Sequence, residues 1–136
     1  MEKNKKMCRF LKNYDIIIPV PVHIKRRIER GFNQCDLIMR QFFELIKSNK
    51  ELHNLDYARN VLIKIKNTKP QSKNKLKDRV RSVVNAFEVR NKEKITNKRV
   101  LIFDDVYTTG STTNECKRVL LNAGAMEVGI LVIAKD

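Results

Sequence analysis

Cysteine is scarce in this chain of 136 residues, which contains only Cys8, Cys35 and Cys116. An odd number of widely spaced cysteines without a C-x-x-C pair excludes both a zinc-binding framework and a disulfide framework. We therefore predict no zinc site. Free, buried thiols are expected, which is the usual state of cysteine in a reducing compartment.

Long apolar runs are also missing. No stretch approaches the length of a transmembrane helix. Residues 1–6 are basic, but the sequence beyond them is too polar for a signal peptide. We therefore expect a cytoplasmic protein without membrane insertion.

Acidic residues are too few to balance the basic ones, at 15 against 29, which gives a net charge of +14. So large an excess favours polyanionic partners such as nucleotides, pyrophosphate or nucleic acid. The alternative is coding bias, because an AT-rich gene would also enrich lysine and asparagine. Aromatic residues make up only 7% of the chain and do not interleave with the basic ones. This weakens the case for a platform that stacks the bases of single-stranded DNA.

Short strands and helices alternate along the chain. Apolar runs predict strands at 16–20, 61–66, 86–89, 100–103 and 128–134. One helix is predicted from Asn33 to about Ser48, and another after the loop at 104–112, with Gly124 as its stop. The residues expected on their apolar faces are Cys35, Ile38, Phe42, Leu45 and Ile46 in the first helix, and Cys116, Val119, Leu120 and Ala123 in the second.

This order predicts an α/β fold with a mainly parallel, twisted sheet flanked by helices. One domain is expected over residues 1–136, with 1–14 as an N-terminal extension and 67–84 as a flexible loop. Ligands of such sheets bind at the carboxyl ends of the strands. The segments 19–31 and 104–112 both follow predicted strands, so we expect them to converge on one crevice.

The stretch Val-Leu-Ile-Phe-Asp-Asp-Val-Tyr-Thr-Thr-Gly-Ser-Thr-Thr, at 100–113, is the most informative in the chain. Asp104 and Asp105 follow an apolar run and can face ribose hydroxyls or a metal-bound water. Gly110 allows a close backbone approach to a ligand. The loop amides and the start of the next helix suit a phosphate. The alternative is a solvated turn followed by an ordinary helix cap, but the combined order predicts a site for a phosphorylated sugar.

That order resembles the signature of the type I phosphoribosyltransferases, which bind phosphoribosyl pyrophosphate (PRPP). The resemblance implies a type I phosphoribosyltransferase-like fold with a mobile hood loop. It assigns Asp104 and Asp105 to the ribose hydroxyls and, through the ligand, to Mg²⁺. It assigns the 5′-phosphate to the loop residues Thr108, Thr109, Gly110, Ser111 and Thr112.

A second signature lies in residues 15–34, where a Pro-Val-Pro-Val-His turn is followed by arginines and by Arg-Gly-Phe-Asn-Gln. It resembles the ComF family, the competence-associated relatives of phosphoribosyltransferases. Arginine suits pyrophosphate because its guanidinium can donate two hydrogen bonds to one phosphate, although a solvated surface arginine is the alternative. The residues that the resemblance places on the pyrophosphate side are Pro21, Val22, His23, Arg26, Arg27 and Arg30.

A third stretch agrees with the ComF family through Thr68, Gln71, Arg79 and Ala86-Phe87. The resemblance makes 67–84 the hood loop that closes over the site and excludes water, with Arg79 joining Asp104 and Asp105 as a catalytic group. Ser82 and Asn74 depart from the family pattern. The cysteine-rich zinc domain that usually begins ComF proteins is not in this sequence, so we expect either a truncated member or a zinc domain supplied elsewhere.

The implied reaction is displacement of pyrophosphate from PRPP by a nitrogen nucleophile, with Mg²⁺ bridging ligand oxygens. Thr108 stands where enzymes of 6-oxopurines carry a general-base aspartate, so hypoxanthine or guanine is not expected as the acceptor. Two alternatives remain: a non-catalytic PRPP sensor or single-stranded-DNA-binding factor serving the competence machinery and DNA uptake, and a decayed remnant. Type I relatives are often dimers, so a homodimer is one expected state.

Overall fold

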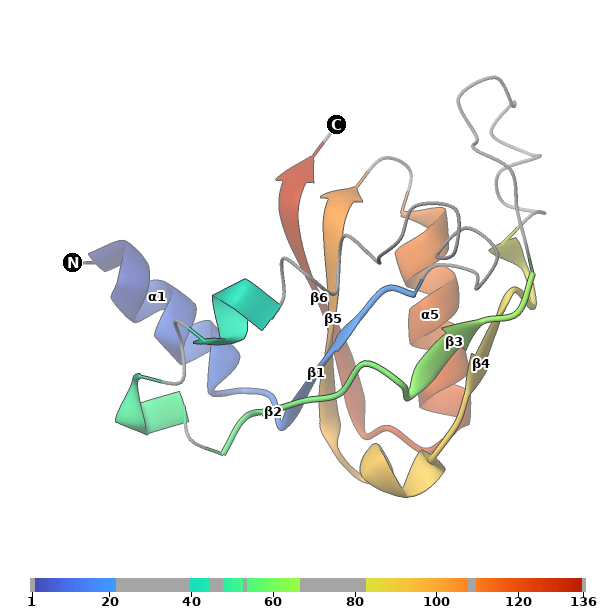
Figure 1. The fold of residues 1–136 in the computed structure, drawn as a ribbon, viewed down its shortest axis with the longest axis horizontal. Coiled ribbons are helices and arrows are strands. Elements are labelled where there is room, and N and C mark those ends of the chain that lie inside the picture. The colour runs from blue at the N-terminus through green and yellow to red at the C-terminus, as the bar shows by residue number, and fades with distance from the viewer. Residues whose placement is uncertain are drawn as a thin grey trace.

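The central element is a parallel sheet with the strand order β2-β1-β5-β6 (Figure 1). The computed structural model describes residues 2–21, 40–44, 48–52, 54–66, 83–107 and 110–135, and only the backbone of 2–5, 105–107 and 133–135. The strands of this sheet are β1 (Ile16–Pro19), β2 (Asp56–Tyr57), β5 (Arg99–Tyr107) and β6 (Glu127–Lys135). All their pairings are parallel, which confirms the predicted class of fold.

Side chains of β1 and β5 alternate between the two faces of the sheet and build a separate apolar core on each. Successive residues of a strand point to opposite faces, so a run of branched and aromatic residues can bury both sides. The first core contains Ile16, Ile18, Val100 and Ile102, and the second contains Ile17, Leu101 and Phe103. A sheet buried on both faces explains why these strands read as continuous apolar runs.

The second core is covered by α1 (Glu2–Leu11) and the 3₁₀ helix η1 (Lys50–Leu52). Cys8 and Leu11 lie one turn apart on α1 and are both buried. The helix was not predicted, because its four apolar residues, Met7, Cys8, Phe10 and Leu11, span little more than one turn after a lysine-rich start. Residues 40–44 are helical, and the Phe42 ring stacks on Phe103 with centroids 6.5 Å apart. The core role predicted for Phe42 is therefore confirmed, while 33–39 and 45–47 lie outside the described residues.

The first core is covered by α5 (Ser111–Asn122), through Cys116 and Leu120. The helix ends as predicted at Gly124, whose φ of +112° is unfavourable for residues with a side chain. The amide of Ala125 donates to the carbonyl of Leu120 at 3.1 Å, and the amide of Gly124 donates to that of Leu121 at 3.2 Å. This pair of bonds satisfies carbonyls that the helix end would otherwise leave open.

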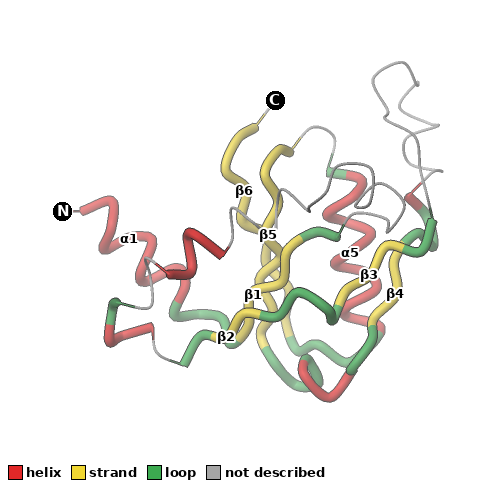
Figure 2. Tube along the Cα trace, in the orientation of Figure 1, coloured by secondary structure: helices red, strands yellow, loops and turns green. Residues whose placement is uncertain are grey.

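Two further strands, β3 (Leu62–Lys64) and β4 (Phe87–Val89), form an antiparallel pair of their own on the α5 side (Figure 2). This pair of strands packs on the first core through the buried side chains of Leu62 and Phe87. The strand predicted at 61–66 is therefore shorter than expected and lies outside the parallel sheet. The two-residue β2, which was not predicted, takes the place beside β1.

Three tight turns of the described chain use asparagine in the left-handed region. Asn85, Asn91 and Asn97 have φ values of 57°, 57° and 58°. Asparagine tolerates this conformation better than other residues that have a side chain. Asn91 precedes the 3₁₀ helix η2 (Lys92–Lys94), which occupies part of the predicted polar turn at 90–97.

Candidate functional site

The carboxyl edge of the parallel sheet is stepped, because β5 extends beyond β1. The register of β1 against β5 ends where Pro19 faces Phe103. Pairing with β6 continues to Tyr107, opposite Lys135. The sequence placed the end of this strand at residue 103, which is wrong, since the ladder with β6 carries it four residues further. Asp104 and Asp105 are the first residues of β5 beyond the end of β1.

Asp104 lies on the face of the sheet that α5 covers. It alternates in phase with Val100 and Ile102, which belong to the core beneath α5. Burial, and after it the negative charge of Asp104, raises the pKa of the Cys116 thiol far above its usual range. The half-buried Asp104 carboxylate is thus close enough to α5 to act on a group inside the helix interface.

The N-terminus of α5 begins at Gly110, which is buried and has φ +78° and ψ 0°. The backbone here needs glycine because this conformation is left-handed. The Gly110 carbonyl accepts the Thr113 hydroxyl at 3.1 Å and the Asn114 amide at 2.8 Å. No described side chain caps this end of the helix, and its first turn contains no acidic residue. The positive end of the helix dipole is therefore not neutralised by a carboxylate on that turn.

Some of the predicted site residues lie on elements that end or begin at the carboxyl edge of the sheet. Asp104 lies in β5, which ends at Tyr107, and the half-buried Ser111 and Thr112 begin α5, the next element along the chain. Pro21, also half-buried, follows β1 at the same edge, where the Val20 amide donates to the Phe103 carbonyl at 2.8 Å. Asp105 lies in β5 by its backbone. Outside the described residues lie Val22, His23, Arg26, Arg27, Arg30, Arg79, Thr108 and Thr109, whose assignments stay predictions.

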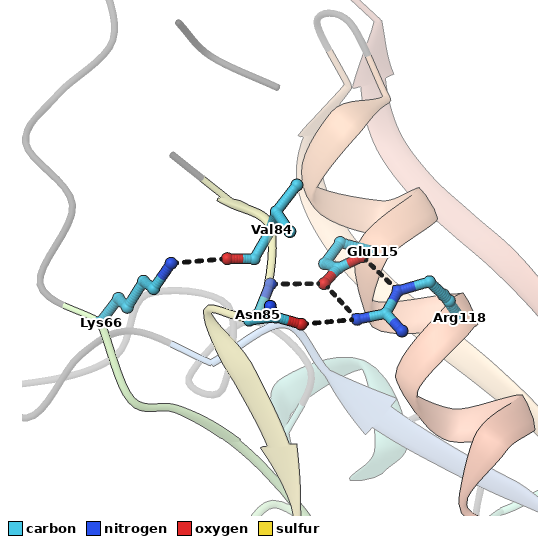
Figure 3. A network of polar contacts seen from close by, with 5 residues as sticks. All are labelled: Lys66, Val84, Asn85, Glu115 and Arg118. Atoms are coloured by element: carbon cyan, nitrogen blue, oxygen red, sulfur yellow. Dashed lines mark hydrogen bonds and ion pairs between the residues drawn. The ribbon is translucent and has the colours of Figure 1, made fainter. Parts of the chain in front are cut away.

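A polar network joins α5 to the end of the β3–β4 pair (Figure 3). Glu115, 8% exposed, accepts two hydrogen bonds of 2.7 Å from Arg118 and one of 2.8 Å from the Asn85 amide. The Arg118 guanidinium also donates to the Asn85 side-chain oxygen at 3.2 Å. These donors, above all the Arg118 guanidinium, lower the pKa of Glu115, so its carboxylate is held in the charged form.

Sequence reasoning missed this network. Glu115 and Arg118 are three residues apart on one helix, a spacing at which opposite charges pair, so that half of the network had a visible signal. Asn85 is separated from Glu115 by 30 positions. Its contribution depends on how β4 packs against α5, which no local pattern reveals.

The fold and the site together define a class of protein. A parallel α/β sheet in which a carboxylate follows the end of the neighbouring strand, and a helix begins after the longer strand, is an arrangement typical of sites for phosphate-containing ligands. A family model described as the phosphoribosyl transferase domain matches residues 48–136, which include β5, the loop after it and α5.

Curated relatives agree with this match. The chain is 34% identical to competence protein F of Haemophilus influenzae over 134 residues, covering 98% of this chain and 56% of the relative. It is 31% identical to the DNA utilization protein YhgH of Escherichia coli K12 over 121 residues, covering 89% and 49%. With competence protein ComFC of Bacillus subtilis it shares 31% identity over 109 residues, covering 80% and 39%. The chain belongs to the phosphoribosyltransferase family and, within it, to the ComF group.

The chain spans about half the length of the curated relatives it matches, between 39% and 56% of the three compared above. What those whole proteins do is therefore not transferred directly to this chain. Among its described helices, none combines the length and the apolar character needed to cross a membrane.

Proposed function

We propose that this chain binds PRPP, or a closely related phosphoribosyl ligand, at the carboxyl edge of its parallel sheet. One observation carries the proposal: Asp104 lies beyond the end of β1 on the face that α5 covers, and α5, whose first turn contains no acidic residue, is separated from the end of β5 by three residues. A carboxylate that can accept bonds from sugar hydroxyls thus lies near a helix end that attracts phosphate.

Each half of the site matches one part of the ligand. The N-terminus of α5, with Gly110, Ser111 and Thr112, would hold the 5′-phosphate through backbone amides and hydroxyls. Asp104, together with Asp105, would hold the ribose hydroxyls. The arginines predicted after β1, and Arg79, would add positive charge around the pyrophosphate.

Mg²⁺ is part of the proposal because a diphosphate ligand would carry it. The donors at the sheet edge are the Asp104 carboxylate and the hydroxyls of Ser111 and Thr112, which are the hard oxygen groups that Mg²⁺ prefers. Within the described ranges, no cluster of three or more His, Cys, Asp or Glu side chains could hold a metal ion. The residues present therefore suit an ion held mainly by the ligand, whose chemistry would be to neutralise charge on the leaving pyrophosphate.

If the bound ligand reacts, the step is displacement of pyrophosphate from the ribose by a nitrogen nucleophile. The protein would contribute positioning and electrostatic stabilisation through its carboxylates and arginines. Thr108 carries no group that takes a proton near neutral pH, so the acceptor would be one that needs no general base at that position. A PRPP sensor without turnover would use the same site.

The paired substitution Asp104→Asn with Asp105→Asn tests the proposal. PRPP with Mg²⁺ should raise the melting temperature of the unmodified chain, because a ligand that binds only the folded state stabilises it. The double variant should fold but lose most of this rise. Pyrophosphate release on the same samples, with and without candidate nitrogen acceptors, separates an enzyme from a sensor.

Asp56→Asn is the matched control, because Asp56 is an exposed aspartate on β2 that pairs with Ile16 at the opposite, amino edge of the sheet. It should keep the full stabilisation by PRPP. An equal rise in melting temperature for the double variant and the unmodified chain would reject the assignment of the two aspartates.

A second candidate function is binding of single-stranded DNA. The net charge of +14 favours it, and the relatives are named for competence and DNA utilization. On this view the chain acts in DNA uptake, with the phosphoribosyl site as a sensor.

A further inference from the structure

Thr113 is a polar side chain on the buried face of α5. It is 1% exposed, on a helix that packs on the first core through Cys116 and Leu120. Burying a hydroxyl costs free energy unless the group is hydrogen-bonded. Valine has nearly the same shape and would fill the position without that cost. Packing alone therefore does not explain the hydroxyl of Thr113.

The Thr113 hydroxyl is bonded to the residue from which α5 begins. It donates to the Gly110 carbonyl at 3.1 Å, and the same carbonyl accepts the Asn114 amide at 2.8 Å. Gly110 has a left-handed φ of +78°. Because glycine has no side chain, its own structure restricts its backbone little. The two hydrogen bonds to its carbonyl therefore help to hold Gly110 in this conformation.

The orientation of the Gly110 carbonyl also sets the direction of the Ser111 amide. The two groups belong to one peptide unit, which is planar and trans, so the N–H points opposite to the C=O. The carbonyl points along the helix, toward Thr113 and Asn114. The Ser111 amide therefore points out of the N-terminal end of α5, which is where the proposed function places the 5′-phosphate.

We propose that Thr113 is a positioning residue of the phosphoribosyl site. Its hydroxyl fixes the peptide unit between Gly110 and Ser111 and so directs the Ser111 amide at the 5′-phosphate. Thr113 is buried and does not itself touch the ligand. The inference rests on the proposed function, and it adds to the phosphate site a residue outside the predicted loop 108–112.

Two substitutions separate the hydroxyl of Thr113 from its packing. Thr113→Val keeps the shape of the side chain and removes the hydroxyl, whereas Thr113→Ser keeps the hydroxyl and removes a methyl group. Thr113→Val should lower the affinity for ribose 5-phosphate about tenfold, the equivalent of one hydrogen bond to a charged group. Thr113→Ser should bind like the unmodified chain, although the lost methyl group should lower its melting temperature. Isothermal titration at a temperature where every variant is folded measures the affinities.

PRPP, titrated in the presence of Mg²⁺, is the second ligand. It carries the same 5′-phosphate as ribose 5-phosphate, so Thr113→Val should weaken the binding of both by the same factor. A loss confined to PRPP would overturn the proposal, because the effect would then lie at the diphosphate rather than at the 5′-phosphate.

Thr96→Val is the matched control. The Thr96 hydroxyl donates to the Lys92 carbonyl at 2.8 Å, a bond of the same kind, and Thr96 lies before the amino end of β5. The substitution should leave both affinities within about twofold of those of the unmodified chain, because distant sites act independently.

Three results would overturn the positioning role. Unchanged affinities in the Thr113→Val variant would show that the hydroxyl only satisfies its own hydrogen bond. An equal loss in the Thr113→Ser variant would assign the effect to packing, and an equal loss in the Thr96→Val variant would make it unspecific. Failure of the unmodified chain to bind both ligands would instead contradict the proposed function, and the inference with it.

Discussion

Gly129 on β6 is a residue whose lack of a side chain is required by its neighbour. A Cβ atom added there would overlap the hydroxyl oxygen and Cζ of Tyr14 and lie 2.9 Å from Cε1. The Tyr14 ring packs on the second core and against Phe10, with ring centroids 5.3 Å apart. Glycine at this position therefore leaves room for the hydroxyl end of the Tyr14 ring against the edge strand β6.

Gly129→Ala should therefore destabilise the fold. Tyr14 would have to leave its place, and overpacking of this kind costs about 1–3 kcal/mol of unfolding free energy. Urea unfolding followed by circular dichroism measures the change.

Tyr14→Leu provides the check, because it removes the atoms that the new Cβ would meet. In that background Gly129→Ala should cost much less than it does alone. An undiminished cost would mean that the loss comes from the strand backbone rather than from Tyr14.

Residue-scale features of the site were predictable where the constraint is local. Gly124 was readable as a helix stop because a left-handed residue is needed there. Gly110 was predicted as a position where the backbone could approach a ligand closely. The structure shows that its left-handed φ is a second reason for glycine at this position. The contact between Asn85 and Glu115 was not predictable, because it arises only after β4 has packed on α5.

At the scale of elements, Asp15 and Arg99 join the amino ends of β1 and β5. The Asp15 carboxylate accepts the Arg99 amide at 2.8 Å and two guanidinium bonds of 3.2 and 3.0 Å. The Asp15 amide in turn donates to the Arg99 carbonyl at 2.8 Å. Backbone and side chain thus act together to set the register of the two central strands.

This pair should make stability depend on acid. The Arg99 side chain, followed by its backbone amide, lowers the pKa of Asp15 in the folded state. The contribution is therefore present above the ordinary aspartate pKa of about 3.9 and is lost as the pH falls through the lower folded value. Asp15→Asn should melt a few degrees lower at neutral pH and lose less stability than the unmodified chain on acidification below about pH 4.

Thermal melting from neutral pH to about pH 3 measures this difference. Asp56→Asn serves again as the control, because it removes a carboxylate on the neighbouring strand and leaves the Asp15 and Arg99 side chains in place. Parallel profiles for Asp15→Asn and the unmodified chain would exclude the pair as a source of acid sensitivity.

Helices and strands were predictable from the sequence where nearby residues alone determine them. The strand that leads into Asp104 is marked in the sequence by its apolar run. The helix after Gly110 is marked by its apolar face and by the glycine that ends it. The end of β5 was not predictable, because only the partner strand β6 extends it to Tyr107. Helix α1 is stabilised by packing on the sheet face that it covers. Its two buried residues alone form too weak a pattern to predict a helix from the sequence.

At the scale of the whole molecule, the excess of positive charge is the dominant feature. Within the part of the chain that the structure describes, surface ion pairs include Lys12 with Glu51 at 3.0 Å and Arg90 with Glu88 at 3.8 Å. Each is partly exposed, so such pairs neutralise little of the field that a polyanion would meet. The charge therefore bears on partners more than on the fold.

Binding of single-stranded DNA, if it occurs, should be strongly dependent on salt. Each phosphate neutralised releases counterions, so the logarithm of affinity should fall with the logarithm of salt with a slope of about −0.7 per contact. Fluorescence anisotropy with a labelled oligothymidine at several salt concentrations measures the slope. An affinity that does not change with salt would reject the electrostatic description.

The family could be predicted from the order of motifs along the chain, because strand, carboxylates, loop and helix are consecutive, and the position of the site stays a prediction. Which groups would surround a pyrophosphate depends on arginines from two separate segments, Arg26, Arg27 and Arg30 in one and Arg79 in the other, all outside the described residues. Their convergence on the sheet edge stays a prediction.

The left-handed turns have a consequence for the chain before it folds. With only 4 glycines in 136 residues, this protein makes three of its corners with asparagine, at Asn85, Asn91 and Asn97. Glycine would relax each corner but would also enlarge the number of conformations open to the denatured chain. At Asn85, substitution by glycine would also remove a hydrogen bond, because the Asn85 side-chain oxygen accepts one from Arg118 at 3.2 Å. The residue that turns the chain also holds the neighbouring helix, and glycine could do only the first.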